Sequence, residues 1–166
     1  MSSQSRRRFR FHPLVRYLMI VLSFTALVYS VYFILVLIPR YGDVSLFMKA
    51  TSVLILYVAG NTLYKHLFTL NSVEISSTGL QLGFILRKRI FISWDRLLRM
   101  DIYKVITHFW KVVYQDEQGN KREFKTSLAF PGIMEILSAI NEFKPDLEMN
   151  ELLTGVLNYK RTKLSV

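Results

Sequence analysis

The chain contains no cysteine. Disulfide bonds, thiolate nucleophiles and cysteine-ligated metal centres are therefore excluded, which fits a cytoplasmic setting for a soluble domain. The three histidines, His12, His66 and His108, are widely separated and have no carboxylates at ligand spacing, so no metal site is predicted. The sequence has no Gly-x-Ser-x-Gly elbow, no phosphate-binding glycine loop and no His-Glu-x-x-His motif. We therefore expect a protein that is not an enzyme and that has no cofactor.

Charged residues are almost absent from two long apolar runs near the N-terminus. Tyr17–Ile38 has no Asp, Glu, Lys or Arg, and Leu46–Tyr64 has only Lys49, close to its start. As a helix the first run would extend about 33 Å, enough for the roughly 30 Å hydrocarbon core of a bilayer. Two such runs in succession favour transmembrane helices over the buried helix of a soluble protein or a cleaved signal peptide. With Pro39 ending the first helix, the sequence predicts a transmembrane helical hairpin over residues 17–70.

Acidic residues are also missing from the N-terminal flank. Residues 1–16 contain five arginines and no carboxylate, and they predict a basic juxtamembrane arm. Because basic residues favour the cytoplasmic side, both termini are expected in the cytoplasm, with the turn between the spans outside. The net charge of the chain is +10, and this arm carries the densest part of it. Attraction of the arm to an anionic leaflet is a sufficient role for this charge, so no nucleic-acid partner is predicted.

The few polar and small residues inside the spans predict helix packing. Ser23, Ala26 and Ser30 share one helical face, and Gly60 and Asn61 lie late in the second run. Small residues let helix backbones approach closely, and Asn61 can bond across the hairpin or to a partner helix. Neither run contains a carboxylate, so a proton relay or an ion pathway is not predicted.

After residue 70 the hydrophobic period changes from helical to alternating. Six strands are predicted between Val73 and Leu128, and a seventh short strand is expected in the same region without a clear position. An amphipathic helix then closes the segment, with its apolar stripe at Ile133, Ile136, Leu137 and Ile140. This order predicts an α+β cytoplasmic domain over 71–145, a curved antiparallel sheet or β-barrel closed by a C-terminal helix.

The tail, residues 146–166, predicts a second amphipathic helix. Acidic residues lie at its start and basic residues at its end, which suits the helix dipole. Three interpretations are open: the helix packs back on the domain, docks on another protein, or lies on the membrane. The candidate residues for partner docking are Leu152, Leu153, Val156 and Leu157.

A basic cluster, Arg87-Lys88-Arg89, occupies a predicted turn of the domain. It is either a solvated turn or a contact for anionic lipid headgroups, since the hairpin holds the domain near lipid. With the N-terminal arm, the candidate anionic-lipid contacts are Arg6, Arg7, Arg8, Arg10, Arg87, Lys88 and Arg89.

Several short stretches carry a resemblance to a known family. They are the Thr-Gly-Leu turn at 78–80, Ile-Ser-Trp-Asp-Arg-Leu-Leu at 92–98, and the hairpin loop at 116–120. With the paired apolar runs, Val73–Phe143 resembles the bacterial pleckstrin-homology-like family of the membrane-anchored type. The resemblance implies a seven-stranded, strongly bent barrel with one C-terminal helix, and no enzymatic activity. Eukaryotic pleckstrin-homology domains bind phosphoinositides through basic residues in the loop between their first two strands. The loop at that place here, Ser77-Thr78-Gly79, has no basic residue, so phosphoinositide binding is not expected.

Two function classes follow for a chain held in the inner membrane. The first is a non-enzymatic, membrane-anchored adaptor or accessory subunit that assembles with other membrane or cytoplasmic proteins, or with itself. The second is a sensor or binder of anionic lipid headgroups at the inner membrane surface. A stable assembly in mild detergent would favour the first, and salt-sensitive binding to anionic vesicles would favour the second.

Overall fold

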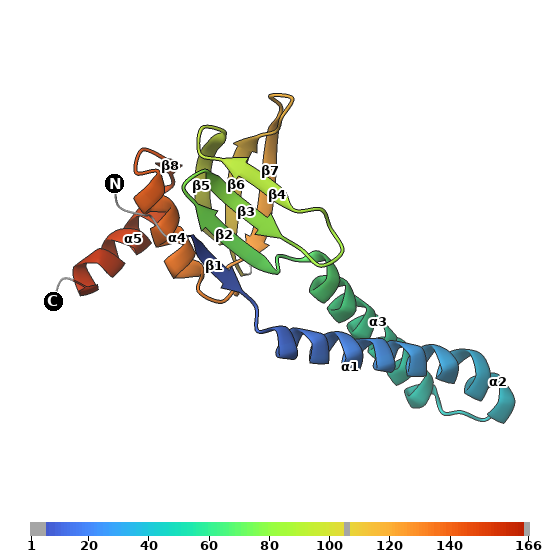
Figure 1. Cartoon of the computed structure of the whole chain (residues 1–166). Coiled ribbons are helices and arrows are strands. Elements are labelled where there is room, and N and C mark those ends of the chain that lie inside the picture. Colours follow the sequence, from blue (N-terminus) through green and yellow to red (C-terminus); the bar gives the residue numbers. More distant parts are fainter. Residues whose placement is uncertain (1–5, 105–106, 165–166) are drawn as a thin grey trace. The chain divides into compact units, whose positions relative to one another are not determined.

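The computed structural model describes residues 6–104 and 107–164, with side chains as far as residue 158 (Figure 1). The chain forms two compact units: a helical unit from His12 to Thr69, and an α+β unit that joins the residues up to Phe11 to those from Leu70 onward. The basic arm predicted over 1–16 is therefore divided at His12, and its described residues before that point belong to the α+β unit. Residues 1–5 of that arm and residues 165–166 of the tail lie outside the described residues.

Two long helices make up the helical unit. The first runs from Pro13 to Tyr41 and combines α1 (Pro13–Tyr32), the π-helical segment η1 (Phe33–Leu37) and α2 (Ile38–Tyr41), and the second is α3 (Leu46–Phe68). By length and composition both are able to cross a membrane. Only 11% of the most apolar stretch of each is buried, whereas the core helix of a soluble protein is mostly buried. These helices indicate association with a membrane.

The prediction that Pro39 ends the first helix is wrong. The chain stays helical to Tyr41, and Gly42, with φ of 61°, ends it. A proline lacks the N–H of the helical ladder, and its ring crowds the carbonyl one turn earlier. Just before Pro39 the N–H of Ile38 bonds to the carbonyl of Phe33, five residues back. This π-turn widens the helix and allows the chain to pass the proline without breaking.

The first sheet of the α+β unit combines one strand that precedes the helical unit in the sequence with three strands that follow it. Its antiparallel order is β1 (Arg7–Arg10), β2 (Ser72–Ser76), β3 (Gly79–Gly83) and β4 (Ile90–Ser93). Arg10 lies opposite Ser72 in the β1–β2 ladder, so the whole hairpin is inserted between two neighbouring strands. The local sequence pattern does not predict β1, because Arg-Arg-Phe-Arg has only one apolar residue and resembles a basic arm.

The second sheet has the order β7-β6-β5-β8. β5 (Leu97–Lys104), β6 (His108–Gln115) and β7 (Lys121–Ser127) are antiparallel, and the two-residue β8 (Glu148–Met149) is parallel to β5. Helices α4 (Ile133–Phe143) and α5 (Glu151–Leu164) complete the unit. The predicted α+β class is confirmed. The described strands form two separate sheets, so the predicted closed barrel is not found among them.

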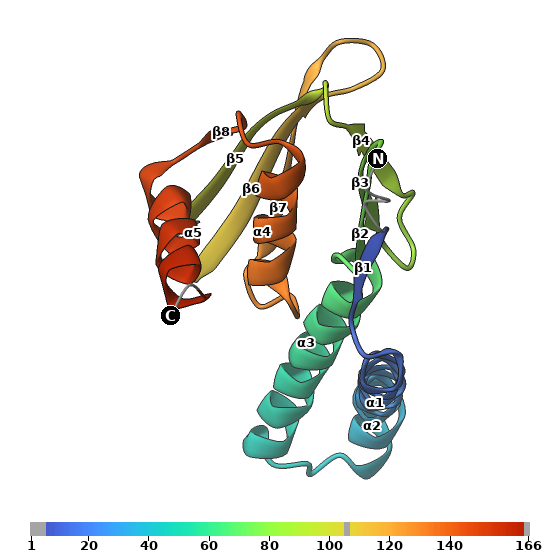
Figure 2. The same cartoon turned by 60° about the vertical axis from the view of Figure 1, so that its left-hand side comes forward.

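The two sheets and α4 share one core (Figure 2). Alternate residues of each strand point inward because successive side chains of a strand face opposite sides. In the first sheet Ile75, Leu80 and Ile92 form a row across three paired strands, and all are almost fully buried. Trp110 of β6 and Ile136 of α4 are fully buried in the same core.

Asn150 connects the second sheet to α5. Its side-chain oxygen accepts the N–H of Ile102 at 3.2 Å, and its amide nitrogen donates to the carbonyl of Ile102. The side chain thus takes the place of a strand backbone beside β5. The same oxygen accepts the N–H of Leu153 at 3.1 Å, which caps the first turn of α5.

The turn between β6 and β7 leads to a pH prediction. Hydrogen bonds from Arg122 (3.0 Å), and from the N–H groups of Asn120 and Gln118, lower the pKa of Asp116 below its usual 3.8. A carboxylate with a lowered folded pKa stabilises the fold above the unfolded pKa, and this contribution is lost as pH falls through the folded value. We expect the opening free energy of β6 and β7, taken from amide exchange corrected for the intrinsic exchange rate, to fall below about pH 4, and Asp116→Asn to reduce that pH dependence. An unchanged profile in the variant would contradict the prediction.

Candidate functional sites

Small and hydroxyl-bearing side chains lie where α1 and α3 meet. Ser23, Ser30, Ser52 and Ala59 are all buried, with exposed fractions between 2% and 8%. Close packing at small residues is the usual way in which apolar helices associate in a membrane. The structure therefore brings the predicted Ser23 and Ser30 to the helix interface, and adds Ser52 and Ala59.

The other predicted packing residues behave differently. Ala26 and Gly60 are half-buried. A side chain added at Gly60 would lie 3.7 Å from the Leu27 side chain, which is ordinary contact, so that glycine is not required by space. Asn61, in α3, is exposed. Its amide therefore does not bond across the hairpin in this structure.

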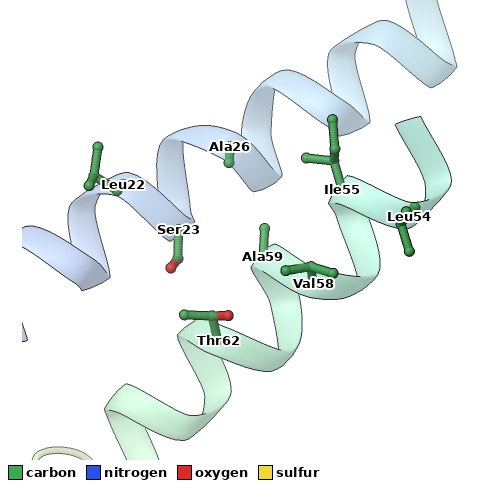
Figure 3. Close-up of a pocket in the computed structure, with 8 residues that line it drawn as sticks. All are labelled: Leu22, Ser23, Ala26, Leu54, Ile55, Val58, Ala59 and Thr62. Atoms are coloured by element: carbon green, nitrogen blue, oxygen red, sulfur yellow. The ribbon is translucent and has the colours of Figure 1, made fainter. Parts of the chain in front are cut away.

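Two grooves open along the hairpin between its helices. The larger, of about 370 Å³, has Ser23 and Ala26 on one wall and Ala59 and Thr62 on the other (Figure 3). Its remaining lining side chains are Leu22, Leu54, Ile55 and Val58. The second, of about 260 Å³, is lined by Tyr29, Ser30, Phe33, Phe47, Met48, Thr51, Ser52 and Ile55. Both are apolar recesses with a few hydroxyl groups, which is the kind of surface that receives another apolar helix.

Arg16 is the main residue of the hairpin that sequence reasoning missed. Its side chain is buried and donates to the backbone carbonyl of His66 at 3.0 and 2.5 Å and to that of Thr69 at 3.1 Å. The last carbonyls of a helix have no partner within the helix, and a cation there also suits the helix dipole. Arg16, in the first turn of α1, therefore caps the end of α3. In the sequence it is indistinguishable from the other N-terminal arginines.

The arginines of the predicted lipid-binding arm are divided between the faces of the first sheet. Arg6 forms an ion pair with Glu74 of β2. Arg7 lies on the other face and pairs with Glu142 of α4 at 3.0 Å. Arg8 and Arg10 are exposed, and Arg8 lies opposite Glu74 in the ladder. Two of these four candidates are thus engaged with carboxylates of their own unit.

The Arg87-Lys88-Arg89 cluster lies in the loop between β3 and β4, and all three side chains are exposed. The guanidinium of Arg87 lies 5.3 Å from the centre of the Phe84 ring, a cation–π contact. Phe84 is buried and packs edge-on against Phe124 of β7. The loop is therefore fixed to the core at its first residue, while its basic residues point into solvent.

The four docking candidates of the tail divide equally. Leu153 and Leu157 are buried in the core of the α+β unit, whereas Leu152 and Val156 are exposed. α5 thus packs on its own unit through one side of the predicted apolar stripe. The other side, with two apolar residues, remains on the surface.

No cluster of three or more His, Asp or Glu side chains that could hold a metal ion occurs among the described residues. The carboxylates with shifted pKa values are surface groups. A hydrogen bond from Ser93 lowers the pKa of Asp95, and Lys111 and Lys125 lower the pKa of Glu123. A general acid needs a raised pKa, so these two carboxylates are held in their ionised form instead.

Comparisons with protein-family models, with curated proteins and with solved structures find no match to this chain.

Proposed function

We propose that this chain is a non-enzymatic, membrane-anchored adaptor or accessory subunit that assembles with other proteins through its helical hairpin. The observation that carries the proposal is the pair of grooves between α1 and α3. Ser23, Ala26, Ala59 and Thr62 leave a recess in a surface that is otherwise covered with large apolar side chains. In a bilayer, recesses at small residues favour a partner helix over lipid, because the partner gains close packing and hydroxyl hydrogen bonds.

The first sheet supports a hairpin with both ends on one side of the membrane. β1 precedes the hairpin, β2 follows it, and the two strands pair from Arg7–Ile75 to Arg10–Ser72. A sheet with such pairing requires that the chain return to the side that it left. The arginines of residues 1–16 favour the cytoplasmic side for that sheet, at the inner membrane.

The order of elements supports the pleckstrin-homology-like type. In the described residues, seven strands, β1 to β7, precede the closing helix α4, and they are divided between two sheets around one core. The type expected from the sequence has seven strands and one C-terminal helix. In this interpretation, the hairpin is an insertion after the first strand.

The test is the mass of the full chain in mild detergent, with a variant that fills the larger groove. The chain has a mass of 19.5 kDa, and we expect the native protein to elute as a larger assembly. Ala26→Leu places an isobutyl group in the groove, and we expect it to weaken association at least about tenfold, roughly 1.4 kcal/mol or more, with a matching growth of the monomer peak.

Val28→Leu is the matched control. It introduces the same side chain on an exposed part of α1 that lines neither groove. This variant should keep the native mass. A monomeric native protein, or equal effects of the two substitutions, would contradict assembly through the groove.

A further inference from the structure

The loop between β3 and β4 combines basic and apolar residues on its surface. Leu86 is 60% exposed and Phe91, at the start of β4, is 57% exposed, on either side of Arg87-Lys88-Arg89. Within the described part of the chain, the three basic residues form no salt bridge. Large apolar side chains exposed beside cations are typical of a surface that binds a membrane interface. The apolar side chains leave water for the acyl-chain boundary, and the cations contact the headgroups.

The loop begins at a specific end of the first sheet. Arg10, Ser72 and Gly83 are register partners across β1, β2 and β3. Two further bonds continue this end: the N–H of Phe11 donates to Asn71 at 3.2 Å, and the N–H of Asn71 donates to Gly83 at 2.7 Å. At this end the chain passes into α1 and returns from α3, and here the loop also starts, at Phe84. The loop thus leaves the sheet at the end that carries both chain connections to the helical unit.

The loop is also anchored well enough to present its residues in a fixed way. Phe84 is buried against Phe124, and the Arg87 guanidinium stacks on the Phe84 ring at 5.3 Å. The strand after the loop returns to the core at Ile92, which is 1% exposed. Exposure of Leu86 is therefore a property of an ordered loop with both ends held in the core.

We propose that the β3–β4 loop docks on an anionic bilayer surface, with Leu86 in the interfacial region and Arg87, Lys88 and Arg89 at the headgroups. The partner is lipid because the end of the sheet that carries the loop is joined directly to two apolar helices able to span a bilayer. Cations near an anionic leaflet are attracted to it within a Debye length. This contact goes beyond the adaptor function and does not depend on it, since the two use different units of the chain.

The absence of native cysteine makes a site-specific label possible. In the full chain reconstituted in nanodiscs, Leu86→Cys carries an environment-sensitive fluorophore, and Gln118→Cys in the exposed β6–β7 turn serves as the matched control. The discs contain phosphatidylcholine alone or an equal mixture with phosphatidylglycerol. In the mixed discs we expect a blue shift and quenching by a lipid-borne quencher at position 86 and neither at position 118.

Charge reversal tests the electrostatic part. We expect Arg87→Glu, Lys88→Glu and Arg89→Glu together to lower the docked-to-undocked ratio more than about tenfold, and high salt to lower it in the same direction. Tryptophan fluorescence of Trp94 and Trp110 verifies that the α+β unit of the variant is folded. An aqueous label at position 86 in both kinds of disc, or the same burial in neutral and anionic discs, would overturn the proposal. A blue shift in detergent caused by a co-purified protein would assign the loop to a protein partner and would also overturn it.

Discussion

Replacing Arg16 by alanine is expected to destabilise the hairpin by about 3 kcal/mol, since each hydrogen bond to a charged group contributes about 1.5–3 kcal/mol. The guanidinium satisfies carbonyls of both His66 and Thr69. Without it, the last turn of α3 loses its partners at a buried position, where unsatisfied carbonyls are costly. The measurement is the loss of helical circular dichroism of the full chain during a titration of mixed micelles with denaturing detergent.

Two further variants separate capping from charge. Arg16→Lys keeps the positive charge but has no planar fork to reach two carbonyls, so we expect an intermediate loss. Arg40→Ala removes an exposed arginine of α2 and should leave the titration unchanged. A full recovery with lysine would mean that the charge alone is sufficient, and the capping role would be wrong.

Gly79→Ala is expected to destabilise the α+β unit by about 3 kcal/mol, the upper part of the range for overpacked sites. Gly79 lies opposite Ser93 in the β3–β4 ladder. A methyl group there would lie 2.3 Å from the carbonyl oxygen of Ile92 and 2.9 Å from the Cα of Ser93. Both atoms are backbone, so relief requires separation of two paired strands. Tryptophan fluorescence during urea unfolding is the measurement, because both tryptophans, Trp94 and Trp110, belong to this unit.

Gly119→Ala is the matched control. Gly79 and Gly119 both have positive φ, 158° and 81°, but a side chain at Gly119 would have no atom within 4 Å. Only the backbone strain remains, about 1 kcal/mol. Similar losses at both glycines would show that backbone conformation, and not the contact with β4, explains the effect at Gly79.

The spacing of apolar residues predicts most of the fold, but it does not predict an element with too few apolar residues to form a pattern. β2 to β7 and α4 were predicted because their apolar residues alternate or recur at helical spacing over several positions. β1 has a single inward apolar residue, Phe9, among arginines, and its pairing partner lies beyond the hairpin. Such a pairing is set by tertiary structure, so local pattern could not find it. At Pro39 the local rule that proline ends a helix gives the wrong boundary, because the π-helical turn before it lets the helix continue to Tyr41.

The candidate sites show the same division. Ser23 and Ser30 were predicted from helical spacing and lie in the helix interface. Leu153 and Leu157 could not be separated from Leu152 and Val156, because a stripe does not reveal which side of it packs on the same chain. Leu86 was not singled out, since in the sequence it continues the alternation of β3. Its exposure follows from the end of β3 at Gly83, which the alternation does not mark.

Insertion of the hairpin between β1 and β2 has a consequence for biosynthesis. β1 is made first, but its partner strand becomes available only after both helices have been synthesised and the chain has returned. Completion of the first sheet therefore waits for synthesis of both helices. In the proposed transmembrane topology, a chain with only one helix inserted would leave β1 and β2 on opposite sides of the membrane. Such a chain would expose an unpaired strand edge, which is prone to aggregation and accessible to proteases. In the proposed topology, the ladder between Arg7–Arg10 and Ser72–Ile75 thus couples folding of the α+β unit to correct membrane insertion.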